Sequence, residues 1–238
     1  MINLHNIDFD KEDFHIKEGV LSGENIVLIT PKFSTKWNKN NIVLRSSVWH
    51  KEGGRLISGG FKKFGTIAEN PEVFIVPREI NVGDRIENKI DGSLLAITYF
   101  NGKLNTRTRG VIDATQHDNG YEIEILKQKY PLVFNNNYIK DNKHTILCEW
   151  LSDNNRIILK YSNCPDIILL NVVNNEDYTY FTNNQLDQVS EELKIRRPEQ
   201  FTFKNLDEIL EKVKEWKDKE GVVWYSQNGQ HLLRLKSA

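Results

Sequence analysis

The sequence predicts an α+β fold, built from antiparallel β-sheets with helices on their outer faces. Three observations lead to this prediction. Short runs rich in Val, Ile, Leu, Thr and Tyr alternate with clusters of Asn, Gly and Asp along most of the 238 residues. Asn-Gly pairs at 101–102 and 228–229 are typical of tight β-hairpin turns, which join antiparallel strands. One segment near the C-terminal end has a clear helical period.

Strands are expected in twelve segments of this kind, at 25–30, 41–49, 72–76, 93–100, 103–109, 121–126, 145–151, 156–161, 167–173, 179–182, 221–226 and 231–236. The two Asn-Gly pairs join neighbouring strands, and Asp153 with the two asparagines after it predicts a further hairpin loop.

A helix is expected from Asn205 to Gly221, because apolar side chains recur there on one face with charges opposite. Asn205 and Glu208 have the spacing of a capping pair at its start, and Gly221 is expected to end it. A weaker helical pattern covers 185–194. No repeat, linker or low-complexity segment divides the chain, so residues 1–238 are expected to form a single domain.

The bulk composition excludes several classes of protein. With 39% hydrophobic and 27% charged residues the chain is neither disordered nor membranous, and no run approaches the roughly 20 apolar residues of a membrane span. No secretory signal is visible at the N-terminus. Cys148 and Cys164 lack C-x-x-C partners, which favours thiols in a reducing cytosol over a disulfide or a zinc site.

The charge balance limits how nucleic acid could bind. Lysine and arginine total 32 against 33 acidic residues. Proteins that bind long nucleic acids nonspecifically usually carry a basic surplus, because phosphate contacts and counterion release drive that binding. A nucleic-acid partner would therefore require a local basic pocket or a further module.

The segment 87–95, ENKIDGSLL, raises the main functional question. Taken alone, Lys89 is a lysine at the start of a strand, whose amine reaches solvent, and Asp91-Gly92 is a turn. The K-x-D-G pattern, however, resembles the signature of covalent nucleotidyltransferases, the superfamily of DNA ligases, RNA ligases and mRNA capping enzymes. Further segments resemble the other motifs of that superfamily, in the expected order.

These segments are TRTRG (106–110), LCEWLSDNNRIILKY (147–161), KEGVVWY (219–225) and LLRLKSA (232–238). Upstream, VLRSSVW (43–49) and SGGFKKFGTIAENP (58–71) resemble elements of the bacteriophage tRNA-repair type of ATP-dependent RNA ligase. The resemblance runs from about Asn25 to Ala238. It implies a nucleotidyltransferase (ATP-grasp-like ligase) domain over residues 1–238, without the C-terminal RNA-recognition domain that such ligases commonly carry.

The resemblance implies that Lys89 attacks the α-phosphate of ATP and retains AMP on its amine. An amine is a nucleophile only when it is neutral, and nearby cations disfavour the ammonium form. The cations expected around it are Arg45, Lys63, Arg109, Arg234 and Lys236, and the same cations would hold the triphosphate and stabilise the transition state.

Further roles follow from the resemblance, position by position. Nucleotide contacts are implied for Arg45, Lys63, Glu87, Gly92, Arg109, Glu149, Arg234 and Lys236. A divalent metal, expected to be Mg²⁺, is implied at Glu149 and Glu220. The residue types agree with these roles: Gly92 permits close approach to a ligand, and a carboxylate such as Glu220 at a predicted helix C-terminus is disfavoured by the helix dipole unless it has a use.

Several points stay open at this stage. Either Glu87 or Asn88 could read the adenine, and either Lys62 or Lys63 could contact the nucleotide, with Lys63 preferred from its spacing to phenylalanine. Arg109 and Arg234 stand where the family often has lysine. Apolar residues around 168–170 and 222–223 are expected to flank the adenine.

The predicted function is that of an ATP-dependent RNA ligase, which joins RNA 5′-phosphate and 3′-hydroxyl ends in the cytoplasm of a bacterial or phage-infected cell, with or without a separate RNA-recognition domain or subunit. The first alternative is a DNA ligase or a capping-type guanylyltransferase. The second is a nucleotide-binding module that adenylates or senses without ligating. The combination of Lys89, Glu149, Glu220 and Lys236 argues against it, because a sensor needs no nucleophile.

Overall fold

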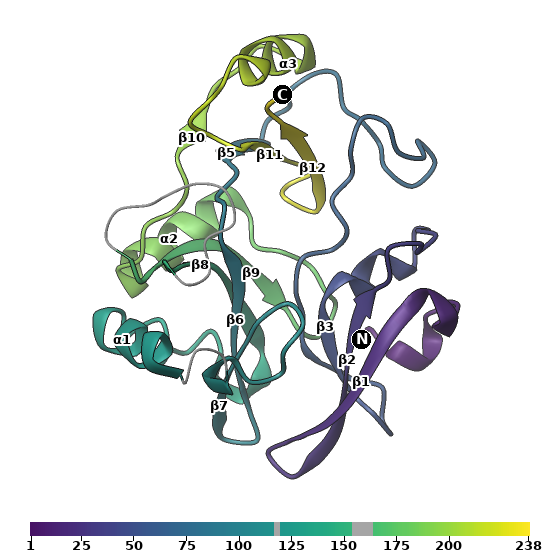
Figure 1. Cartoon of the computed structure of the whole chain (residues 1–238), viewed down its shortest axis with the longest axis vertical. Helices are drawn as coiled ribbons and strands as arrows, with labels where there is room; N and C mark the ends of the chain where they lie inside the picture. The colour runs from purple at the N-terminus through teal and green to yellow at the C-terminus, as the bar shows by residue number, and fades with distance from the viewer. Residues whose placement is uncertain (117–119, 154–163) are drawn as a thin grey trace.

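The computed structural model describes residues 1–116, 120–153 and 164–238, and it contains three four-stranded antiparallel sheets (Figure 1). The first sheet has the order β1 (Phe14–Leu21), β2 (Glu24–Pro31), β3 (Ser47–His50), β4 (Leu56–Ser58). The second has the order β7 (Lys103–Arg107), β6 (Ser93–Phe100), β8 (His144–Leu151), β9 (Asp166–Asn174). The third has the order β10 (Gln200–Phe201), β5 (Arg85–Asn88), β11 (Gly221–Ser226), β12 (His231–Lys236).

The described α-helices are α1 (Tyr121–Lys129), α2 (Asn183–Leu193) and α3 (Leu206–Lys214). Short 3₁₀ helices include η1 (Leu4–Asn6), η2 (Lys11–Asp13), η3 (Asn41–Arg45), η4 (Ala114–Gln116) and η6 (Lys140–Asn142). Within the described ranges, no helix has the length and apolar character required to cross a bilayer.

Each helix covers a sheet. Apolar side chains of α1 and α2 share one core with the second sheet, and α3 packs against the third sheet with Leu206, Ile209 and Val213. In Figure 1 the third sheet and α3 lie at the top, above the first sheet on the right and the second sheet on the left. A central core that includes Trp49, Leu147 and Val223 joins all three sheets. The predicted α+β fold of antiparallel sheets is therefore confirmed.

The apolar strands and their hairpins were predicted well. The strands expected at 93–100, 221–226 and 231–236 have these bounds in the structure. Asn101 and Gly102 have φ values of 49° and 74°, which are the positive values that a type I′ turn requires. The capping pair at α3 is also present, since the Asn205 side chain accepts a hydrogen bond from the Glu208 backbone N–H at 3.0 Å. Cys148 is a buried free thiol, as expected.

Other segment predictions were wrong. Residues 121–126 begin α1, because Ile123 and Leu126 are buried one helical turn apart. Residues 72–76 form turns, 179–182 contribute one isolated bridge at Tyr180, and 41–45 form η3 instead of a strand. Helix α3 ends at Lys214, before the predicted Gly221, although Trp216 still packs on Phe201 with ring centroids 5.0 Å apart.

Four strands were missed, namely β1, β4, β5 and β10. Each is short or has several exposed polar residues, so its apolar alternation is weak. The strand expected at 156–161 and most of the hairpin loop after Asp153 lie outside the described residues.

Candidate active site

A pocket of about 380 Å³ lies between the second and third sheets, beside η3 and the segment that follows β4. The strand register explains which side chains face it. Glu87, Val223 and Arg234 stand opposite one another across β5, β11 and β12, so they share one face of the third sheet. Leu94 and Glu149 stand opposite each other on β6 and β8 of the second sheet. These five residues line the pocket from two sides.

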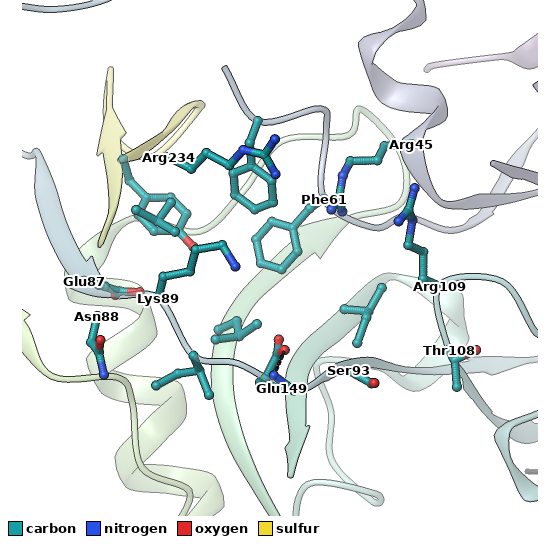
Figure 2. A pocket seen from close by; sticks show the side chains of 17 residues that line it. Arg45, Phe61, Glu87, Asn88, Lys89, Ser93, Thr108, Arg109, Glu149 and Arg234 are labelled. Carbon is teal, nitrogen blue, oxygen red and sulfur yellow. Dashed lines mark hydrogen bonds between the residues drawn. The ribbon is translucent and has the colours of Figure 1, made fainter. Parts of the chain in front are cut away.

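Lys89 lies on the short crossing by which the chain leaves β5 and enters β6. Its backbone N–H donates to the Gly221 carbonyl at 2.9 Å, which holds the crossing against β11. Its side chain points into the pocket and is 21% exposed (Figure 2). The amine Nζ donates to Glu220 Oε2 at 2.8 Å.

Glu220 forms ion pairs with two lysines, Lys89 and Lys236. Its other oxygen, Oε1, lies 3.1 Å from Nζ of Lys236, which is half exposed. Burial opposes ionisation of Glu220, but the hydrogen bonds and charges of Lys89 and Lys236 outweigh it and lower the pKa of the carboxyl group. The predicted nucleophile therefore has a carboxylate as its direct partner, and its amine has to leave that carboxylate before it attacks an electrophile.

Glu149 lines the pocket, whereas Glu220 and Lys236 lie outside its lining and reach it only through Lys89. Burial raises its pKa to about 7, although the charge of Lys89 and the hydrogen bond from Gly92 lower it. That hydrogen bond runs from the Gly92 N–H to Glu149 Oε1 at 2.9 Å. A Cβ at Gly92 would lie 2.5 Å from the Trp150 carbonyl oxygen, so the glycine is required for the close approach of the crossing to β8.

Three arginines converge on another side of the pocket, Arg45 from η3, Arg109 from the segment after β7, and Arg234 from β12. Figure 2 shows the Arg234 guanidinium above the ring of Phe61 and those of Arg45 and Arg109 to the right of it. Burial, with repulsion from Arg109 and Arg234, lowers the pKa of Arg45 to about 10. Burial and repulsion from Arg234 also lower the pKa of Arg109.

Within the part of the chain that the structure describes, none of these three guanidinium groups forms an ion pair or a side-chain hydrogen bond. Arg45 lies over the Phe64 ring, with its Cζ 5.1 Å from the ring centroid. Three like charges held together without a counter-ion are costly, so the arrangement is suited to bind an anion with several charges, such as a polyphosphate.

The two lysines of the 58–71 segment do not line the pocket. Lys63 Nζ binds Glu69 Oε1 at 2.8 Å, and burial lowers its pKa despite that partner. Lys62 lies over the rings of Tyr178 and Tyr180, 5.7 and 5.5 Å from their centroids, and burial lowers its pKa as well. Lys63 is the one whose charge interacts with Arg45 and Arg234, so it stays the preferred candidate.

At the remaining end, Glu87 and Asn88 both line the pocket, together with apolar side chains that include Leu170 and Val223. Glu87 Oε1 already accepts hydrogen bonds from Arg85 at 2.9 Å and Arg197 at 2.8 Å. Asn88 Oδ1 is buried and has no hydrogen-bond partner among the described residues. At the end of the pocket expected to hold adenine, the Glu87 carboxylate is thus already occupied, and the unpaired Asn88 carbonyl oxygen is covered by protein.

Sequence reasoning missed Arg107, which supports the site without lining it. Arg107 is fully buried, and its guanidinium donates to Ser46 Oγ and Ser58 Oγ at 2.8 Å and to the backbone carbonyls of both serines. Ser46 Oγ in turn donates to the Arg109 carbonyl at 2.9 Å. Arg107 thereby joins the neighbours of Arg45 and Arg109. The sequence gives no signal for this role, because its partners are about 50 to 60 residues away.

The carboxyl groups near Lys89 are suited to a divalent metal whose remaining ligands come from a bound nucleotide. In the described ranges, no group of three or more His, Cys, Asp or Glu side chains is arranged to hold a metal by itself. The charge of the nearby Glu220 contributes to the raised pKa of Glu149. Mg²⁺ in nucleotide-dependent enzymes is typically bound by one or two carboxylates together with substrate phosphates. Glu149 in the pocket lining and Glu220 at the Lys89 amine, opposite three arginines, fit that pattern.

Comparisons with known proteins identify relatives of this arrangement. A family model described as RNA ligase matches residues 43–237. A putative bifunctional polynucleotide kinase/RNA ligase of Autographa californica nuclear polyhedrosis virus is 28% identical over 168 residues, which cover 63% of this chain and 22% of the viral protein.

Solved structures share the fold. An archaeal ATP-dependent RNA ligase has a TM-score of 0.62 at 14% identity, over 93% of this chain and 58% of the archaeal chain. A putative ATP-dependent DNA ligase from Aquifex aeolicus has a TM-score of 0.58 at 14% identity, over 95% of this chain and 60% of its own. A variant of the Naegleria gruberi RNA ligase, determined with ATP and Mn, has a TM-score of 0.54 at 10% identity, over 97% and 82%. The chain thus spans about a fifth of the viral relative and little more than half of the archaeal one.

Proposed function

The chain belongs to the RNA ligase family, and on this premise we propose that it is an ATP-dependent ligase that joins RNA ends through AMP bound covalently to Lys89. The observation that carries the proposal is the composition of one pocket. A lysine amine enters it beside two carboxyl groups, and three arginines without ion-pair partners among the described residues form another wall. These groups provide a nucleophile and the positive charge that attack by an amine on a polyphosphate requires.

In the proposed first step, Lys89 Nζ loses its ammonium proton to solvent, leaves Glu220 as a neutral amine and attacks the α-phosphorus of ATP, and a second proton leaves the nitrogen as the N–P bond forms. An N–P bond forms, the bond to the bridging oxygen breaks, and pyrophosphate leaves. Arg45, Arg109 and Arg234 hold the phosphates and offset the charge that develops on them. A divalent ion, by our proposal Mg²⁺ held by Glu149 and Glu220, would supply further neutralisation of the triphosphate when bound.

In the following steps an RNA 5′-phosphate oxygen attacks the AMP phosphorus and displaces the lysine. The 3′-hydroxyl of a second RNA end then attacks the activated 5′-phosphate, a phosphodiester bond forms, and AMP leaves. Lys236 and Lys63 remain candidates for phosphate contacts, and Glu87, Asn88 and Gly92 for contacts at the nucleoside end. We propose that residues 1–238 act together as the nucleotidyltransferase domain.

Incubation with α-labelled ATP and Mg²⁺ tests the first step. The protein should become labelled, and Lys89→Ala should abolish the label, because no other described lysine has its amine in the pocket. Lys103→Ala, at an exposed hairpin, is the matched control and should label normally. A labelled Lys89→Ala protein would contradict the assignment of the nucleophile.

Substrate assays then separate the alternatives. Parallel labelling with α-labelled GTP distinguishes a ligase from a capping-type enzyme. Sealing of 5′-phosphorylated single-stranded RNA, compared with nicked DNA, distinguishes an RNA ligase from a DNA ligase. Labelling without joining of either substrate would support an adenylating module and overturn the proposed ligation.

A further inference from the structure

A basic loop with an exposed aromatic ring lies between β2 and η3, outside the pocket. We call residues 32–40 the basic loop. From Pro31 through Arg45 the chain has three lysines and one arginine but no acidic residue, in a protein whose overall charge is −1. Phe33, within this loop, has its entire side chain exposed to solvent. Lys36 and Lys39 are also exposed, and neither forms an ion pair within the described chain.

Hydrogen bonds at both ends of the basic loop hold its backbone in place. Asn38 and Asn41 bind each other's backbone N–H groups at 2.8 Å, and Asn41 Nδ2 donates to the Lys36 carbonyl at 2.9 Å. At the other end, the Lys32 N–H donates to the Asp13 carbonyl at 2.9 Å. The Trp37 ring packs edge-on against a core phenylalanine. A braced loop presents its ligands with a smaller loss of entropy on binding.

The basic loop leads directly to Arg45, one of the three arginines that line the pocket. η3 follows it and ends at Arg45, and a 3₁₀ helix of this length extends over about 10 Å. The Lys63 N–H donates to the Ile42 carbonyl at 2.9 Å, which ties η3 to the segment that supplies Phe61 and Phe64 to the pocket. A hollow of about 690 Å³ lies beside the loop, lined by residues of 37–40 and 70–75, with Glu72 as its single acidic member.

We propose that the basic loop binds the single-stranded RNA whose end is joined in the pocket, with Lys36 and Lys39 on backbone phosphates and a base stacked on Phe33. This inference rests on the proposed function and names the site of its RNA substrate. Single-stranded nucleic acid is bound by positive side chains along the backbone and by aromatic rings under the bases. A protein partner would not require an acid-free run of basic residues beside the exposed ring.

The test uses the full chain without ATP and a 5′-phosphorylated RNA of about 12 nucleotides with a fluorophore at its 3′ end. Fluorescence anisotropy should show that Phe33→Ala weakens RNA binding about tenfold, because a stacked base is lost. Lys36→Gln with Lys39→Gln should weaken it as well. It should also reduce the slope of log affinity against log salt by about 1.4, since each phosphate contact to a single strand contributes about 0.7.

Matched controls separate a site from a general charge effect. Lys103→Gln with Lys140→Gln removes two exposed lysines elsewhere, and Val82→Ala truncates another fully exposed apolar side chain. Both should leave the affinity and the salt slope unchanged. Unchanged RNA binding in the loop variants, or an equal loss in the controls, would overturn the proposal.

Different results would refute the proposed function and the proposed RNA-binding role of the basic loop. Self-labelling with ATP requires no RNA, so the loop variants should label Lys89 within about twofold of the unmodified protein. A loss of labelling in the loop variants would show that the loop supports the pocket itself and would overturn the RNA assignment. Absence of labelling in the unmodified protein would instead refute the proposed function, while the anisotropy assay would still decide the role of the loop.

Discussion

Arg107 and Arg109 stand two positions apart in one motif and have opposite surroundings. Arg107 is fully buried and its guanidinium donates hydrogen bonds to two serines and to backbone carbonyls from the first sheet. Arg109 lines the pocket with Arg45 and Arg234, and its guanidinium has no hydrogen-bond partner in the described ranges. A basic residue whose donors are all used within the protein holds the fold together. One whose donors are unused is available to a ligand.

A related difference, in counter-charge, separates two larger regions. Next to Glu87, at the end of the pocket expected to hold adenine, Arg85 and Arg197 both bind that carboxylate, and the Arg85 guanidinium lies 3.7 Å from the Tyr225 ring centroid. At the arginine wall, three cations of the same kind face only one another and the pocket. The two regions differ in counter-charge. Arg85 and Arg197 share the Glu87 carboxylate, although Arg85 Nη1 and Nη2 have no hydrogen-bond partner among the described residues. The three pocket arginines have no carboxylate partner in the same ranges.

Removal of Arg107 should give the largest effect on stability. Arg107→Met leaves Ser46, Ser58 and several buried carbonyls without donors, and each such group costs roughly 1–3 kcal/mol. We expect a loss of about 4 kcal/mol in the free energy of unfolding, measured by urea denaturation. A loss below about 1 kcal/mol would show that these hydrogen bonds do not hold the first two sheets together.

Removal of Arg109 should weaken nucleotide binding and leave the stability of the fold nearly unchanged. Arg109→Met removes charged hydrogen bonds to phosphate, each of roughly 1.5–3 kcal/mol, so the Kd for ATP should rise about 10- to 100-fold. The free energy of unfolding should change by less than about 0.5 kcal/mol, because a repelling neighbour of Arg234 is removed. Calorimetric titration with ATP and urea denaturation check the two parts. A destabilisation as large as that of Arg107→Met would abolish the distinction between the two arginines.

Glu149, which also lines the pocket, should have a smaller effect on the free energy of unfolding, and that effect should depend on pH. Its pKa is raised from an ordinary 4.5 to about 7, mainly by burial, so the folded state keeps a proton that the unfolded state releases. Glu149 therefore makes the protein less stable as the pH rises from about 4.5 to 7. Glu149→Gln, which keeps an acceptor for the Gly92 N–H, should remove roughly 1–2 kcal/mol of this decline. Urea denaturation at pH 4.5, 6 and 8 measures it, and parallel profiles for both proteins would contradict the assignment.

The parts of the fold that were predicted correctly depend on local chemistry. The hairpin between β6 and β7 follows from Asn101-Gly102, and the start of α3 follows from Asn205, since both need only neighbouring residues. Residues 121–126 were misassigned because YEIEIL satisfies a strand alternation and a helical i, i+3 pair equally well. Burial against the second sheet decides between them, and burial depends on distant parts of the chain.

The candidate site follows the same division. The motif positions of Lys89, Glu149, Arg109 and Arg234 predict which residue types line the pocket, and the structure brings them together. The direct partners were not predictable, because Lys89 binds Glu220 across 131 residues and Glu87 binds Arg197 across 110. The expected ring of cations around Lys89 is in fact divided. Three arginines form a separate wall, Lys63 is bound to Glu69, and Lys236 shares a carboxylate with Lys89.

The position of Lys89 on the crossing between β5 and β6 has a mechanical consequence. β5 belongs to the third sheet and ends at Asn88, whereas β6 belongs to the second and begins at Ser93. The amine is thus carried by a short peptide that joins the second and third sheets, which also share the central core. If the cavity widens when a leaving group departs or a polynucleotide enters, the nucleophile will move relative to both sheets. Attachment of AMP to Lys89 and its later transfer would then depend on the same movement.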